Sequence, residues 1–130
     1  MILGGGPVGV EMAQAFATLG ARVDLVEGMD HLLPREPRPL GEALGEALAG
    51  ERLRLHLGRH ASNVGRDHGG FVVSLEDSST LRGERLLVAT GRRPRVDDLG
   101  LENVGIEANP RGIQVDARMS AGTASGRSVT

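Results

Sequence analysis

The sequence predicts an α/β fold that begins with two parallel strands joined by a helix. The short apolar run 1–3 leads into a glycine-rich turn over residues 4–9, which indicates a buried strand followed by a tight turn. Apolar residues at helical spacing follow over residues 7–19, with a proline at the first helical position and Gly20 after the last turn. Residues 21–27 alternate apolar and polar side chains and end in an acid, which predicts the second strand. The apolar positions of the helix are Val8, Met12, Ala15, Phe16 and Leu19.

The middle of the chain predicts a second helix and a small antiparallel meander. Residues 28–39 hold three prolines and form a loop, and residues 40–49 place their leucines on one helical face. Three short apolar segments follow, the last of them expected to be buried, and turn-like sequence separates them. Their spacing indicates a meander packed on the edge of the parallel unit. These predicted strands cover residues 53–57, 71–75 and 85–90.

The composition favours a soluble, cytoplasmic protein and excludes several kinds of chemistry. The chain has 130 residues, 39% of them hydrophobic, and no apolar run approaches the roughly 20 residues of a membrane helix. We expect no secretory signal, and the net charge of -2 gives no reason to expect a nucleic acid or a membrane as partner. Because the chain has no cysteine and no lysine, it holds no disulfide, no thiolate nucleophile and no Schiff-base lysine.

The four histidines show no metal-ligand spacing, and we expect them to be surface or turn residues. The sequence contains no Gly-x-Ser-x-Gly nucleophile motif either. We therefore predict no metal site and no catalytic residue within this chain. The histidines are His31, His56, His60 and His68.

The glycine turn is the most informative motif, because its spacing fits a dinucleotide-binding, Rossmann-like unit. In the pattern Gly4-x-Gly6-x-x-Gly9, the first glycine permits the tight turn and the second lets a pyrophosphate approach the backbone. The third glycine lets the helix pack closely on the sheet. Pro7 and Val8 begin this helix, whose free N–H groups and dipole stabilise phosphate charge.

Glu27, at the end of the second predicted strand, favours NAD over NADP. An acid about 20 residues after the turn accepts hydrogen bonds from the adenosine ribose, and it would repel a 2′-phosphate. No arginine follows in residues 28–30. Two alternatives remain open at this point. The unit could bind no nucleotide and carry Glu27 on its surface, or it could be a stand-alone, non-catalytic nucleotide-binding or sensing domain.

Four motifs in order resemble the flavin-dependent pyridine nucleotide-disulfide oxidoreductases, the family of dihydrolipoyl dehydrogenase and mercuric reductase. They are the glycine turn with its helix start at 4–11, the segments 25–27 and 32–34, and Ala-Thr-Gly-Arg-Arg-Pro at 89–94. The resemblance implies an NAD domain inserted into an FAD-binding domain, followed by a dimerisation domain. It also implies that hydride passes from the nicotinamide to flavin and then to a disulfide or other acceptor.

The resemblance implies that this chain is a fragment of such an enzyme, which binds nucleotide but does not catalyse by itself. Residues 1–95 would be the NAD(H)-binding domain, and residues 96–119 a remnant of the crossover into the FAD-binding domain. The implied partners are NAD(H), the FAD domain and a dimer partner, with FAD as a cofactor of the full-length protein. Residues 120–130 would be a disordered or out-of-frame tail.

The resemblance also assigns roles to single residues. The three glycines would bind pyrophosphate and Glu27 the adenosine ribose. Glu11 would lie near the junction of nicotinamide and flavin, facing a lysine of the FAD domain, or else be an ordinary first-turn acid favoured by the helix dipole. Pro7 departs from the aromatic residue that many members place there. The predicted cofactor-binding residues are Gly4, Gly6, Pro7, Val8, Gly9, Glu11, Glu27 and Gly91.

The last residues depart from the family pattern, which continues toward a Gly-Asp pair whose aspartate binds the FAD ribitol. With suitable codons, the segment beginning at Gly122 reads in another frame as His-Gly-Val-Trp-Ala-Val-Gly-Asp. Our hypothesis is that the chain from about Gly122 onward is an out-of-frame reading. In-frame genomic codons with no family-like alternative frame would contradict it.

Overall fold

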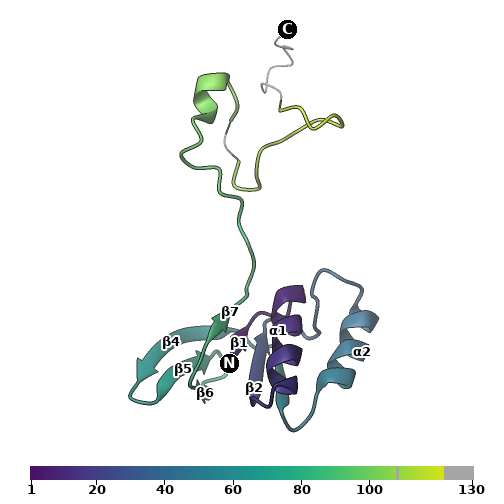
Figure 1. The fold of residues 1–130 in the computed structure, drawn as a ribbon, viewed down its shortest axis with the longest axis vertical. Coiled ribbons are helices and arrows are strands. Elements are labelled where there is room, and N and C mark those ends of the chain that lie inside the picture. The colour runs from purple at the N-terminus through teal and green to yellow at the C-terminus, as the bar shows by residue number, and fades with distance from the viewer. Residues whose placement is uncertain (108, 122–130) are drawn as a thin grey trace. The chain divides into compact units, whose positions relative to one another are not determined.

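The computed structural model describes residues 1–107 and 109–121 and divides the chain into two compact units, Met1–Gly91 and Arg92–Thr130. The first unit holds both sheets and both α-helices (Figure 1). Its fold is α/β and Rossmann-like, so the predicted fold class is confirmed.

A parallel sheet with the strand order β3-β2-β1-β7 forms the centre of the first unit. Helix α1 (Pro7–Thr18) connects the two central strands and begins with a proline in its first turn. The chain then passes through helix α2 (Arg38–Leu48) before it reaches the third strand of the sheet. The strands are β1 (Ile2–Leu3), β2 (Val23–Glu27), β3 (Leu53–Leu57) and β7 (Leu87–Val88).

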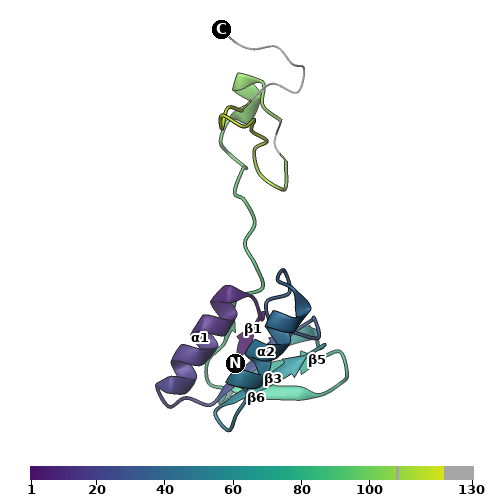
Figure 2. The same ribbon diagram turned by 90° about the vertical axis from the view of Figure 1, so that its right-hand side faces the viewer.

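Both helices pack against one face of this sheet, where the main core lies. Figure 2, viewed from the helix side, shows α1 and α2 in front of the strands. The core residues on this face come from β1, α1, β2, β3 and the loop before α2, and they are buried apolar side chains. They are Ile2, Val10, Ala13, Val23, Leu25, Leu32 and Leu53.

A separate antiparallel sheet covers the opposite face of the parallel sheet (Figure 1). Its strands are β4 (Ala61–Asp67), β5 (Gly70–Leu75) and β6 (Thr80–Gly83), in the order β4-β5-β6. Alternate residues of a strand point to opposite faces, so Leu3 and Val26 face away from the helices. They form a second buried cluster with Val73 and Leu75 of the meander.

The structure differs from the sequence prediction in how three segments pair. Residues 53–57 form β3 beside β2 rather than a meander strand, because Val23 and Leu53 pair in parallel and share one core. Residues 85–90 contain β7, which returns to pair with β1, and its Val88 is 62% exposed rather than buried. The meander itself is built from β4 to β6, and it packs on a face of the parallel sheet without extending its hydrogen-bonded edge.

The described residues of the second unit, 92–107 and 109–121, are largely irregular, as the sequence predicts. Its regular element among the described residues is the 3-10 helix η1 (Leu101–Val104), flanked by Gly100 and Gly105 in left-handed conformations. Most of the predicted tail, residues 122–130, lies outside the described residues. No helix in the part of the chain that the structure describes is long and apolar enough to cross a membrane.

Candidate functional site

The turn between β1 and α1 depends on Gly4. This residue has a φ of +106°, which side chains rarely allow, and its N–H donates to the carbonyl of Val26 at 2.8 Å. A Cβ atom on Gly4 would lie 2.4 Å from the carbonyl oxygen of Ala89. A glycine is therefore required both by the backbone conformation and by the chain that leaves β7.

Gly9 and Gly6 face different surroundings. A Cβ atom on Gly9 would lie 1.9 Å from the carbonyl oxygen of Gly4, so the helix rests directly on the turn. A Cβ atom on Gly6 would meet no described atom within 4 Å. Gly9 is therefore needed for packing, whereas Gly6 keeps the space in front of the helix open.

The N-terminus of α1 carries donors that the described chain does not use. Gly6 is the residue before the helix, Pro7 has no N–H, and no described side chain caps this end. Val10 is the first residue to bond within the turn, donating to Gly6 at 3.0 Å, and the N–H groups of Val8 and Gly9 have no acceptor among the described residues. Free N–H groups at the positive end of a helix dipole, beside an open space, fit a pyrophosphate.

Glu27 lies next to this turn, although it is far away in sequence. Its Oε2 accepts a hydrogen bond from the N–H of Gly5 at 2.6 Å, and its Oε1 accepts one from the N–H of Met29 at 2.9 Å. The loop after β2 is tied to the same turn, because Leu33 donates to the carbonyl of Gly5 at 2.8 Å. A carboxylate has about four acceptor sites, so further donors can bind to Glu27.

The structure places the other predicted site residues around this centre or at its margin. Pro7 is exposed, and Val8, 58% exposed, lies beside it at the start of α1. Glu11 is exposed one turn further along, and α1 has no acid in its first turn, so the first-turn alternative for Glu11 is wrong. Gly91 ends the first unit with a φ of +139°.

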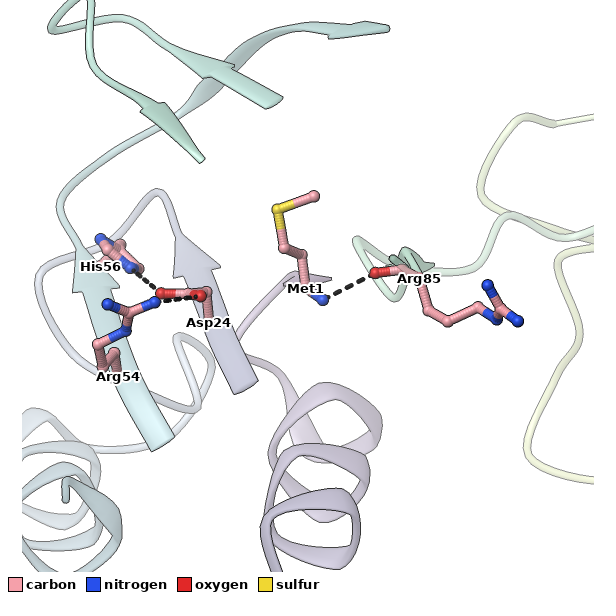
Figure 3. Close-up of polar contacts among 5 residues, drawn as sticks. All are labelled: Met1, Asp24, Arg54, His56 and Arg85. Atoms are coloured by element: carbon pink, nitrogen blue, oxygen red, sulfur yellow. Dashed lines mark hydrogen bonds and ion pairs between the residues drawn. The ribbon is translucent and has the colours of Figure 1, made fainter. Parts of the chain in front are cut away.

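Sequence reasoning missed a second polar cluster, which joins β2 and β3 (Figure 3). Asp24 is 6% exposed, and its carboxylate accepts hydrogen bonds from His56 Nε2 and Arg54, both at 2.8 Å. Burial raises the pKa of Asp24, but the hydrogen bonds and charges of these two partners together lower it by more. The pKa of Asp24 therefore lies below its ordinary value. The signal in the sequence is an acid in a buried strand, whose partners appear only once the pairing with β3 is known.

Two histidines differ from the expectation of surface or turn residues. His56 is half-buried within β3, where its Nε2 contacts the carboxylate of Asp24. His31 lies in the loop before α2 but is buried, and its Nδ1 donates to the carbonyl of Leu32 at 2.8 Å. No group of three or more histidine or acidic side chains among residues 1–107 and 109–121 could hold a metal ion.

The first strand is tied to the β7 segment at both of its ends. The Met1 ammonium donates to the Arg85 carbonyl at 2.8 Å (Figure 3), and the carbonyl of Met1 accepts from Leu87 at 3.0 Å. At the other end, Ala89 donates to Leu3 at 2.7 Å. These bonds bring Ala89 and Thr90 of the family-like segment beside Gly4 in the glycine turn.

The sequence of the chain matches one protein family over nearly its whole length. A family model described as pyridine nucleotide-disulphide oxidoreductase matches residues 1–125. The chain belongs to this family. The family is FAD- and NAD(P)-dependent, and the resemblance seen in the sequence motifs is confirmed at this level.

Individual members of the family support the assignment. The dihydrolipoyl dehydrogenase of Thermus scotoductus is 38% identical over 125 residues, which cover 92% of this chain and 27% of the relative. The probable pyridine nucleotide-disulfide oxidoreductase RclA of Escherichia coli is 36% identical over 119 residues, covering 91% and 27%. A solved Cu(II) complex of the flavoprotein disulfide reductase RclA has a TM-score of 0.83 at 33% identity, covering 95% of this chain and 28% of that chain. The chain therefore spans about a quarter of the length of these family members.

Proposed function

We propose that this chain is the NAD(H)-binding part of an FAD-dependent oxidoreductase. The observation that carries the proposal is the carboxylate of Glu27, held 2.6 Å from the N–H of Gly5 beside the uncapped start of α1. This arrangement offers one acceptor for hydroxyl groups and, next to it, a set of donors for phosphate oxygens. A dinucleotide with a ribose and a pyrophosphate presents both kinds of group.

In this proposal the backbone binds the pyrophosphate. The N–H groups of Val8 and Gly9 point out of the first turn of α1, and the helix dipole adds positive charge there. Because Gly6 has no side chain and open space in front of it, the phosphates can approach the backbone closely. Gly4 and Gly9 contribute by keeping the turn tight against β7 and α1.

Glu27 then binds the adenosine ribose and sets the choice of nucleotide. Its carboxylate accepts hydrogen bonds from ribose hydroxyls, whereas a 2′-phosphate at the same place would meet its negative charge. No arginine stands in residues 28–30 to offset that repulsion. The proposal is therefore NAD(H) rather than NADP(H).

The larger reaction is proposed for the whole protein. In this proposal a bound nicotinamide supplies a hydride, which passes to FAD and on to a disulfide or other acceptor. This chain has no cysteine, so the proposal places the redox pair, the FAD site and the dimer partner outside it. Residues 96–119 would lead toward the FAD-binding domain, and Glu11 and Gly91 would lie toward the nicotinamide end of the site.

Isothermal titration of the chain with NADH and with NADPH tests the proposal. We expect measurable binding of NADH and binding of NADPH that is at least about tenfold weaker, since placing like charges together costs several kcal/mol and each ~1.4 kcal/mol is a tenfold change in affinity. Absence of binding of either nucleotide at millimolar concentrations would contradict the nucleotide site. A preference for NADPH would contradict the role given to Glu27.

A further inference from the structure

His60 lies against the residue that directly follows Glu27. A Cβ atom on Gly28 would lie 2.1 Å from Cε1 of the His60 imidazole, 2.6 Å from Nδ1 and 2.8 Å from Nε2. Three atoms of the ring are thus close to one point above the Gly28 backbone. The imidazole occupies the position that a side chain of residue 28 would otherwise take.

Backbone hydrogen bonds fix this placement. The N–H of Gly58 donates to the carbonyl of Met29 at 2.8 Å, and the N–H of Arg59 donates to the carbonyl of Glu27 at 3.1 Å. On the other side, the carbonyl of His60 accepts from the N–H of Glu76 at 3.0 Å. The turn between β3 and β4 is therefore fastened to the end of β2 and to the meander, with His60 between them.

We propose that His60 is a second side chain of the adenosine-ribose site, acting together with Glu27; this inference rests on the proposed function. A ribose hydroxyl both donates and accepts hydrogen bonds. The Glu27 carboxylate can only accept, and it already holds two backbone donors. A neutral imidazole has one donor nitrogen, which complements the lone pairs that the hydroxyl still offers.

The identity of Gly28 supports this assignment. The end of β2 is the place where side chains distinguish a ribose 2′-hydroxyl from a 2′-phosphate in dinucleotide-binding folds. Here residue 28 contributes no side chain, and the imidazole from another turn of the chain stands in its place. His60 is exposed, so a ligand can reach its ring nitrogens.

A titration with two ligands tests the role of His60. The first ligand is NADH, and the second is its analogue without the 2′-hydroxyl on the adenosine ribose. We expect His60→Ala to weaken NADH binding about three- to tenfold, the usual effect of losing one hydrogen bond, and to leave the affinity for the analogue unchanged. An equal loss for both ligands would contradict the hydrogen bond to the hydroxyl, as would no loss for NADH.

Two further variants keep the result interpretable. His68→Ala removes an exposed histidine from the turn between β4 and β5 and should bind both ligands as the parent chain does. Gly28→Ala forces the imidazole to move, so it should weaken NADH binding to a similar extent, and adding His60→Ala to it should cause no further loss. If the parent chain binds no NADH, the proposed function fails; if it binds NADH and His60→Ala binds it equally well, this inference alone fails.

Discussion

The backbone N–H of Gly5 donates to the carboxylate of Glu27 at 2.6 Å across a separation of 22 residues. Gly5 is buried, and a Cβ atom on it would lie 2.9 Å from the Cβ and Cγ atoms of Glu27, so the two residues are in direct contact. This contact joins the end of β2 to the turn after β1. Glu27 therefore stabilises the shape of the turn and at the same time presents its remaining acceptor sites beside it.

Glu27→Gln should separate these two roles. The amide keeps the size of the side chain and one oxygen that can accept from Gly5, so the fold should persist. We expect NADH affinity to fall about tenfold, because a charge-assisted hydrogen bond to the ribose becomes a neutral one. NADPH should be affected less, since the repulsion of its phosphate is also removed. Isothermal titration with both nucleotides measures the change in their ratio.

Glu36→Gln is the matched control for this substitution. Glu36 is an exposed glutamate of the loop before α2, and its backbone N–H, rather than its side chain, makes the described contact with Leu33. The substitution Glu36→Gln should leave the affinities for NADH and for NADPH unchanged. A Glu27→Gln variant with the same NADH to NADPH ratio as the parent chain would remove the basis for the predicted preference.

Alanine substitutions at Gly6 and Gly9 should have opposite consequences. Gly6 has a φ of -73° and open space around its Cβ position, so Gly6→Ala should leave the thermal midpoint of unfolding unchanged. Its methyl group would project where the phosphates approach, and NADH affinity should fall at least about tenfold. Gly9→Ala would place a methyl group 1.9 Å from the Gly4 carbonyl oxygen and should destabilise the fold by about 1–3 kcal/mol.

Denaturant unfolding and calorimetric titration of both variants check this contrast. We expect Gly6→Ala to unfold at the same denaturant concentration as the parent chain but to bind NADH weakly. We expect Gly9→Ala to unfold at a lower denaturant concentration than the parent chain. Normal NADH binding by Gly6→Ala would show that the pyrophosphate does not pass in front of this residue. Full stability of Gly9→Ala would show that the turn can relax away from the helix.

The parts of the fold that could be predicted are those determined by local sequence. The glycine turn, the proline at the start of α1 and the acid at the end of β2 each act within a few residues of their own position. Their spacing therefore predicted the β-α-β unit, with the bounds of α1 correct to within one residue of the observed Pro7–Thr18. The closeness of Gly4 and Glu27 also follows from the sequence, because each comes at the carboxyl end of a parallel strand and these ends lie at the same edge of the sheet.

The parts that could not be predicted depend on contacts between distant segments. The apolar spacing in α1 singled out Val8, Phe16 and Leu19, yet these are 58%, 43% and 82% exposed. The buried residues of the helix are instead Gly9, Val10 and Ala13, because small side chains let the helix lie close to the sheet. Likewise, alternation identified β3 as a strand but could not show that β2 is its partner, and the Asp24 cluster depends on that pairing.

The Asp24 carboxyl should make stability depend on pH in the acid range. Its pKa in the folded chain lies below the value of about 3.9 expected when unfolded, so its contribution is present above about pH 4 and is lost as the pH falls through the folded pKa. Asp24→Asn should lower the free energy of unfolding by about 1–3 kcal/mol near pH 6 and flatten its decline below pH 4. Urea unfolding at several pH values measures both effects.

An exposed carboxylate provides the comparison for Asp24. Asp30 forms an ion pair with Arg38 at 2.9 Å, but both side chains are more than half exposed, so solvent screens the pair. Asp30→Asn should change the free energy of unfolding by less than about 1 kcal/mol. An Asp24→Asn variant with the same stability and the same acid profile as Asp30→Asn would show that the buried cluster is not held by its charge.

Two glycines of α2 should respond to alanine with opposite signs, although both are buried on the same helix. A Cβ atom on Gly41 would lie 2.0 Å from the carbonyl oxygen of Leu32 and 2.6 Å from His31 Nδ1, so Gly41→Ala should destabilise the fold by about 1–3 kcal/mol. A Cβ atom on Gly45 would meet Leu55 at an ordinary contact distance of 3.6 Å, and Gly45→Ala should stabilise the fold by about 0.5–1 kcal/mol through its helix propensity. Urea midpoints of the two variants, measured beside the parent chain, test this. Equal shifts in the two midpoints would mean that α2 can move away from the loop that holds His31, and that its position against the sheet is not fixed by the close approach at Gly41.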